Sequence, residues 1–244
     1  MISIDKVNTG NNPISKIAEL NAKNHKGFFL DLVIYLSVMF LIRELYFSNL
    51  SFIINGLFWS FTCFAVATWR MRVRGITWKD LGLSRPKNLF KTFMISGLIL
   101  AAVVISLVLF NVIIDQFSLF DTPEVSSENT VSKFGDLKGN WKLFFSIIPL
   151  VLIESCLEEL LDRGFLINWF EKLFSKTSIA TFLAVVLQAA IFGFRHSYDL
   201  SERSITVGII GLIMGIAYVK FGRNLWPLII AHCILNTMSF IDRV

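Results

Sequence analysis

The sequence has little charge, few cysteines and few histidines for a chain of 244 residues. Charged residues make up 17% of it, against about 25% in an average soluble domain. Hydrophobic residues make up 55%, which is above the usual content of about 45–50%. This composition excludes an ordinary soluble domain and indicates a protein whose solvent is lipid. The net charge of +5 informs membrane topology and does not indicate a nucleic-acid partner.

Three cysteines are present, and all of them lie in apolar stretches with no two close in sequence: Cys63, Cys156 and Cys233. Neither a disulfide framework nor a cysteine-based metal site is indicated. The apolar stretches also lack the two-residue alternation of a membrane β-barrel. Since only helices and closed barrels satisfy their backbone hydrogen bonds in lipid, a helical bundle is the architecture left.

Seven apolar runs have lengths near, or extendable to, the roughly 20 residues that span a bilayer. They are residues 28–42, 50–69, 93–114, 143–157, 179–194, 205–219 and 225–238. The sequence therefore predicts an all-α fold, a polytopic transmembrane bundle of about seven spans. We expect residues 1–26 to form a flexible cytoplasmic tail and residues 27–244 to form one membrane-embedded domain. The spacing of Gly211 and Gly215 in the sixth run predicts tight helix packing.

The basic residues crowd one connection, between the second and third runs: Arg70, Arg72, Arg74, Lys79, Arg85, Lys87 and Lys91. The positive-inside rule places this connection in the cytoplasm. The connection 115–140 is acidic and long, which suits the outer side, as a solvated linker or, alternatively, a lid. These features predict a multi-pass protein of the cell membrane with a cytoplasmic N-terminus and an outer C-terminus.

Ionisable residues within apolar runs cost roughly 2.5–3.5 kcal/mol each on insertion scales, so they are the first candidates for function. The fourth run holds or is followed by five of them: Glu154, Glu158, Glu159, Asp162 and Arg163. Two of the three histidines, His196 and His232, also lie in the hydrophobic region, whereas His25 lies in the tail. Each fragment alone is equally well explained by helix packing. Their combination indicates a site.

Helical spacing predicts distinct roles for these side chains. Glu159 and Arg163 are four residues apart and share a face, so we expect an ion pair between them. Glu158 points about 100° away and remains as a carboxylate able to act as a base. His232 and Asn236 are also four apart, and such a pair can donate hydrogen bonds to an oxyanion.

Three motifs resemble those of the CAAX-type prenyl endopeptidase and bacteriocin-processing family of intramembrane proteases, also called the Abi family. They are E-E-x-x-x-R at residues 158–163, F-x-x-x-H at Phe192 and His196, and H-x-x-x-N at His232 and Asn236. Residues 80–83 and 224–232 also look like family segments, so the resemblance covers the chain from about Trp78 onward. One departure stands before Arg163, where Asp162 replaces the usual aromatic or aliphatic residue. Its carboxylate is expected to compete with Glu159 for Arg163.

The resemblance implies hydrolysis of a peptide bond in a membrane peptide or a lipidated protein tail. Glu158 and His196 would activate water, His232 and Asn236 would stabilise the oxyanion, and Glu159 and Arg163 would hold their helix in register. No cofactor is expected. The alternative is zinc bound by four of these residues, Glu158, Glu159, His196 and His232, although the sequence lacks H-E-x-x-H.

Two other classes of function compete with the protease hypothesis. Buried Glu and His side chains also serve proton-coupled transporters, and a catalytically silent scaffold or immunity protein would carry the same motifs without using them. His232 and Asn236 distinguish a protease from a transporter, because hydrolysis uses both side chains and a proton path does not need them.

The depths of the two halves of the site raise a difficulty. If residue 143 starts outside and residue 179 starts inside, simple spans would place Glu158 and His196 many ångströms apart. We therefore expect residues 164–176 to form a re-entrant or surface helix after the fourth span, which would bring His196 to the depth of Glu158.

Overall fold

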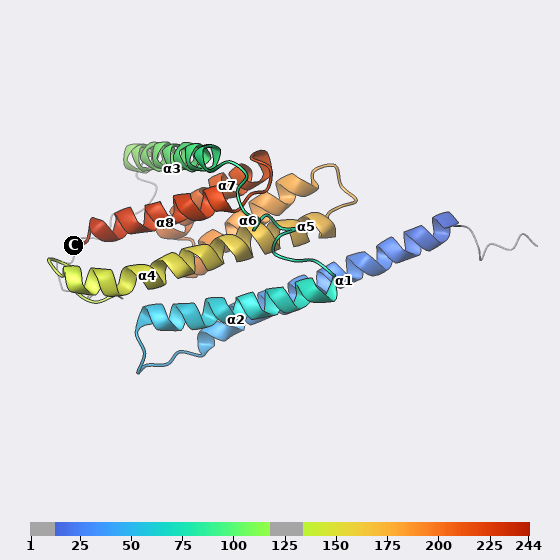
Figure 1. The fold of residues 1–244 in the computed structure, drawn as a ribbon, viewed down its shortest axis with the longest axis horizontal. Helices are drawn as coiled ribbons and strands as arrows, with labels where there is room; N and C mark the ends of the chain where they lie inside the picture. Colours follow the sequence, from blue (N-terminus) through green and yellow to red (C-terminus); the bar gives the residue numbers. More distant parts are fainter. Residues whose placement is uncertain (1–12, 118–133) are drawn as a thin grey trace, which may run out of the picture.

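The computed structural model describes the backbone of residues 13–117 and 134–244, and the side chains of residues 25–117 and 134–244. The described residues form helices and no strand. The eight α-helices, seen in Figure 1, are α1 (Pro13–Leu41), α2 (Phe52–Val73), α3 (Leu89–Phe117), α4 (Trp141–Glu158), α5 (Asn168–Leu173), α6 (Ala180–Ser197), α7 (Glu202–Lys220) and α8 (Trp226–Ile241). A 3-10 helix (Ile42–Glu44) follows α1, and a π-helix (Glu159–Ile167) joins α4 to α5.

Each of the seven apolar runs coincides with one long helix, so the predicted polytopic helical bundle is confirmed. Within the described residues, α1, α2, α3, α6 and α7 contain segments long and apolar enough to cross a membrane. Helix α8 is apolar but has only 16 residues, and α4 carries Lys142, Glu154 and Glu158. The protein is therefore a multi-pass integral membrane protein, and α4, the helix that leads to the predicted site, carries two glutamates in its last two turns.

Helix α4 continues without a break through the π-helix into α5, as Figure 1 shows. The expected re-entrant or surface helix over residues 164–176 is therefore wrong in form, because residues 164–173 extend the fourth helix. The extension still solves the difficulty of depth. Glu158 lies roughly 20–25 Å before the turn at residues 174–179, and His196 lies about as far after it on the returning helix α6, given 1.5 Å per residue.

Helix α1 begins at Pro13, inside the stretch that was expected to be a flexible tail. Once an apolar helix is nucleated, each further residue adds one hydrogen bond, so helix extends easily into a polar flank. In Figure 1 this end of α1 projects beyond the other helices. Residues 1–12 and most of the acidic 115–140 connection lie outside the described residues.

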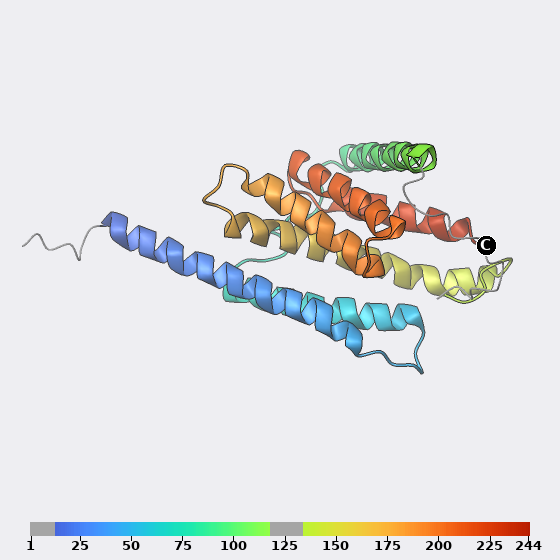
Figure 2. The ribbon, with the colours of Figure 1, turned by 180° about the vertical axis from the view of Figure 1, so that it is seen from behind.

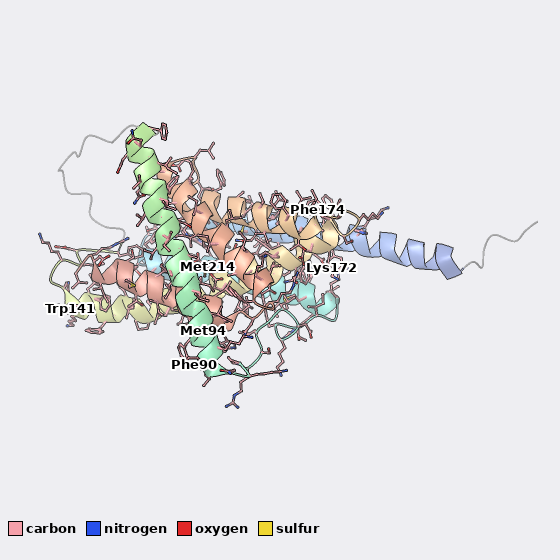
Figure 3. All side chains as sticks on the ribbon, turned by 90° about the horizontal axis from the view of Figure 1, so that it is seen from above. Phe90, Met94, Trp141, Lys172, Phe174 and Met214 are labelled. Carbon is pink, nitrogen blue, oxygen red and sulfur yellow. The ribbon has the colours of Figure 1, made fainter. Side chains whose placement is uncertain are left out.

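Helices α1, α2, α6 and α8 pack against α4 or α5, and α3 packs against α7 and α8. Figure 2 shows α6 and α7 side by side on one face of the bundle, and in Figure 3 helix α3 crosses α7 and α8 at a steep angle. A Cβ atom on Gly193 of α6 would clash with the backbone oxygen of Ser204 in α7. One on Gly211 would lie 3.0 Å from Phe192, and one on Gly215 3.1 Å from Val185. The predicted close packing at the glycines of α7 is confirmed.

The family-like segments at residues 80–83 and 224–232 meet each other in space. The Leu225 amide donates to the Gly82 carbonyl at 3.2 Å, and the Tyr218 hydroxyl donates to the Leu81 carbonyl at 2.8 Å. Gly82 has φ +102° and leaves no room for a Cβ beside the Arg223 carbonyl, so glycine is required there. In the same exposed loop, a hydrogen bond from the Thr77 hydroxyl holds the pKa of Asp80 below its usual value. This loop anchors the start of α8.

A buried carboxylate, Asp31 of α1, ties three helices together. Asp31 is fully buried and lies 2.6 Å from Arg70 and 2.8 Å from Arg74, both in or just after α2. The Trp169 indole of α5 donates to the same carboxylate at 3.1 Å. Because a charge buried in a bundle must be paired, this cluster fixes α1 against α2 and α5.

Replacing Asp31 by Asn should destabilise the bundle, since the side chain keeps its shape while both arginines lose their counter-charge. We expect a loss of about 3 kcal/mol in the free energy of unfolding, at the low end of the range for breaking a buried pair because Arg74 is partly exposed. Thermal unfolding in detergent measures it. Asp115→Asn, an exposed site, is the control, and equal melting temperatures for both variants would contradict the assignment.

Candidate active site

A cavity of about 680 Å³ lies among α1, α2, α4, α6, α7 and α8. Four of the predicted site residues line it: Glu158, His196, His232 and Asn236. They come from the end of α4, the end of α6 and the middle of α8. The expectation that these rare polar groups of the apolar runs converge on one cavity therefore agrees with the geometry.

Glu158 lies between the two histidines. One carboxylate oxygen is 3.6 Å from Nε2 of His196, and the other is 3.5 Å from Nε2 of His232. The Glu158 side chain is only 13% exposed. Contacts of this length are longer than a direct hydrogen bond and suit a bridging water.

The second ring nitrogen of each histidine is fixed by a partner. Nδ1 of His196 lies 2.6 Å from the Phe192 carbonyl, and Nδ1 of His232 lies 2.7 Å from the Glu159 carboxylate. A carbonyl and a carboxylate only accept hydrogen bonds, so Nδ1 carries the proton in both rings. In the neutral form of each ring, Nε2 is therefore a free acceptor that faces Glu158.

Glu159 and Arg163 form the predicted ion pair. Their contact is 3.0 Å, and neither side chain is exposed. The same Glu159 oxygen binds His232, so this carboxylate joins the π-helix to α8. The Arg163 guanidinium also lies 4.3 Å from the centre of the Phe192 ring, where the face of the ring attracts a cation.

Asn236 lies one turn after His232 on α8, and its amide nitrogen donates to the Ser155 hydroxyl of α4 at 2.8 Å. Ser155 is fully buried and its own hydroxyl donates to the Val151 carbonyl. This contact fixes the amide beside the cavity.

The expected competition of Asp162 for Arg163 is wrong. Asp162 binds Arg195 of α6 at 2.6 Å, and the same Arg195 nitrogen lies 3.4 Å from Glu158. Arg195 directly precedes His196, so it reaches the π-helix from the facing helix. The departure from the family motif is thus compensated by a cation on another helix, and the Glu159–Arg163 pair is left intact.

Two further charged residues near Glu158 were not assigned a role from the sequence. Arg195 lines it, as does Glu154, which lies one helical turn before Glu158 and accepts a hydrogen bond from the Ser60 hydroxyl. Glu154 lies in an apolar run and Arg195 directly follows one, so the signal was present. The sequence does not show which residues of different helices pair, and that pairing is what brings these two side chains to the site.

The four residues considered as zinc ligands do not converge as one set. Glu158 and the Nε2 atoms of both histidines face each other, but Glu159 contacts the opposite nitrogen of His232 and is occupied by Arg163. Across residues 25–117 and 134–244, no group of three or more His, Cys, Asp or Glu side chains is arranged to hold a metal ion. The positive charge of Arg195 beside Glu158 would also repel a metal cation bound there.

Comparison with known proteins agrees with the motifs. Residues 140–238 match the family model of the Rce1-like type II CAAX prenyl endopeptidases. Over this part, called the Rce1-like region below, the chain is similar to that family. No curated protein and no solved structure matches the chain.

The Rce1-like region runs from the residue before α4 to near the end of α8, and it contains all three motifs. It starts later than the resemblance drawn from the sequence, because the segment at residues 80–83 lies outside it. Helices α1 and α2 also lie outside it, although they contribute Met39, Trp59 and Ser60 to the wall of the cavity.

The Asp162–Arg195 contact predicts a non-additive pair of substitutions. Arg195→Leu alone should cost about 3–5 kcal/mol of stability, because it leaves Asp162 as an unpaired buried charge. Asp162→Leu alone should cost less, because Arg195 keeps its contact with Glu158. The double variant should be more stable than either single variant. Melting temperatures of the four proteins in one detergent test this, and additive losses would show that the two side chains do not interact.

Proposed function

We propose that this protein is an intramembrane endopeptidase that hydrolyses a peptide bond in a membrane peptide or lipidated protein tail without a metal ion. The match of residues 140–238 to the Rce1-like type II CAAX prenyl endopeptidases supports it. The observation that carries the proposal is the position of the Glu158 carboxylate, which faces the Nε2 atoms of His196 and His232 at 3.6 and 3.5 Å within one cavity.

Glu158 and His196 activate water in this proposal. With Nδ1 of His196 donating to the Phe192 carbonyl, its Nε2 accepts one hydrogen bond from a water while Glu158 accepts the other. Glu158 takes the proton as the water attacks the peptide carbonyl, and it returns the proton to the leaving amine. Arg195 keeps a positive charge beside this carboxylate.

His232 and Asn236 stabilise the oxyanion of the tetrahedral intermediate. In this role Nε2 of His232 donates, and Nδ1 already donates to Glu159. The ring then carries both protons, and the carboxylates of Glu159 and Glu158 on either side balance its charge. The Asn236 amide, fixed by Ser155, supplies a second donor of the kind that stabilises oxyanions.

Glu159 and Arg163 act as positioning residues. Glu159 orients His232 through Nδ1, and Arg163 neutralises Glu159 in a setting where neither side chain is exposed. Asp162 is occupied by Arg195, so it is not available to replace Glu159 as the partner of Arg163.

The two adjacent glutamates predict different losses when each becomes glutamine. Glu158→Gln removes the base and keeps the shape, so the cleavage rate should fall by about 10²–10⁴-fold with the fold retained. Glu159→Gln leaves Arg163 and His232 without a carboxylate, so the melting temperature should fall together with activity. Cleavage of a membrane peptide and thermal unfolding, measured in one detergent, test both.

A Glu158→Gln protein that still processes peptides at the full rate would overturn the protease assignment in favour of binding or transport. Comparing membrane-peptide profiles of cells that express the parent or Glu158→Gln would identify natural substrates. His25→Gln, in a residue remote from the motifs, is the matched control and should change neither rate nor stability.

The absence of a metal requirement is a separate prediction. Purified active protein, freed of metal by a chelator and checked by elemental analysis, should retain its cleavage rate. Loss of activity with the chelator and its recovery on adding zinc would instead assign Glu158, His196 and His232 as ligands.

A further inference from the structure

The cavity of the proposed active site is cationic away from its catalytic groups. Besides Arg195, three arginines line it: Arg43 after α1, Arg203 in the first turn of α7 and Arg243 after α8. Arg203 and Arg243 are exposed, whereas Arg43 is half-buried. These three, called the rim arginines below, come from segments that meet at the end of the bundle where α2 begins and α8 ends (Figure 1).

Arg43 is held in a defined orientation. One of its guanidinium nitrogens donates to the Arg195 carbonyl at 2.8 Å. Its guanidinium carbon lies 4.9 Å from the ring centre of Trp59 and 4.3 Å from that of Tyr198. A guanidinium has five N–H donors, so a single bond to a carbonyl leaves donors for a ligand.

The rim arginines are not engaged in ion pairs within the described part of the chain, although each has an acidic neighbour in sequence: Glu44, Glu202 and Asp242. Arg195, the fourth arginine that lines the cavity, is paired with the carboxylates of Asp162 and Glu158. None of the three rim arginines forms an ion pair with a described residue. The positive-inside rule does not explain the rim arginines. They lie at the end of the bundle where α2 begins, whereas the basic connection at residues 74–88 follows the other end of α2.

We propose that the rim arginines bind a carboxylate of the peptide substrate, so that the enzyme prefers peptides with an acidic group near the cleaved bond. This inference rests on the proposed function. Planar guanidinium groups match carboxylates geometrically. Aromatic rings hold two of the three in place, Trp59 beside Arg43 at 4.9 Å and Phe240 beside Arg243 at 5.3 Å.

The length of α8 limits where the acidic group lies in the substrate. Arg243 follows Asn236 by roughly 10 Å and His232 by roughly 16 Å along the helix. An extended peptide covers about 3.3–3.6 Å per residue. The carboxylate is therefore about three to five residues from the cleaved bond, and its source is an Asp or Glu side chain or the free C-terminus.

A binding experiment tests the inference without depending on cleavage. The full chain carrying Glu158→Gln is purified in neutral detergent, and its affinity is measured by fluorescence anisotropy. The probes are labelled apolar peptides with one Asp at successive positions, their Asn counterparts, and the same peptides with a free or amidated C-terminus. We expect about tenfold tighter binding of the Asp or free-acid peptide than of its neutral counterpart.

The rim arginines are then changed in that background. Arg203→Gln with Arg243→Gln should abolish the preference, Arg203→Lys with Arg243→Lys should retain most of it, and Arg72→Gln with Arg85→Gln, exposed sites at the other end, should leave it unchanged. Equal affinity for acidic and neutral peptides would overturn the inference. So would a preference that survives both Gln changes.

Anionic lipid is the competing ligand, and a second arm addresses it. If phosphatidylglycerol vesicles bind the parent through Arg203 and Arg243 while acidic and neutral peptides bind alike, the rim recognises lipid phosphate and the inference is wrong. Parallel cleavage assays with the parent separate the two proposals, since a parent that cleaves acidic and neutral peptides equally well contradicts this inference alone.

Discussion

Every charge inside this bundle has to find a partner, because hydrocarbon and packed side chains solvate ions poorly. That constraint explains why polar contacts between helices occur in clusters. Asp31 joins α1 to α2 and α5, Glu159 joins the π-helix to α8, and Asp162 joins it to α6. The same contacts that balance charge therefore also determine which helices lie together, and the catalytic groups take their positions from them.

The π-helix carries several of these paired charges in one segment. All nine of its residues are buried, and it carries three of the charged side chains around the site. Such turns are rare and are found mostly at functional sites. Its wider turn keeps Glu159 and Arg163 on one face while Asp162 faces α6, so adjacent acidic residues serve different helices.

The sequence predicted the helices well because each apolar run has the length and composition of a span. It also predicted the Glu159–Arg163 pair, since spacing by four residues is a property of one helix. The Asp162–Arg195 pair was missed because it joins residues from different helices, and no local spacing encodes such a contact. The re-entrant helix was expected because simple spans would place Glu158 and His196 at different depths. The structure removes that difficulty differently, since partners on α6 and α8 allow the fourth helix to continue past Glu158.

The unbroken helix from α4 to α5 has a consequence for how the protein sits in lipid. From Trp141 to Leu173 it is roughly 50 Å long, against a hydrocarbon core of about 30 Å. It must therefore tilt or project from the bilayer, and Glu158 lies near its middle. Hydrophobic mismatch changes tilt as membranes become thicker or thinner. The depth of the cavity below the lipid headgroups, and so the length of substrate needed to reach it, will vary with bilayer thickness.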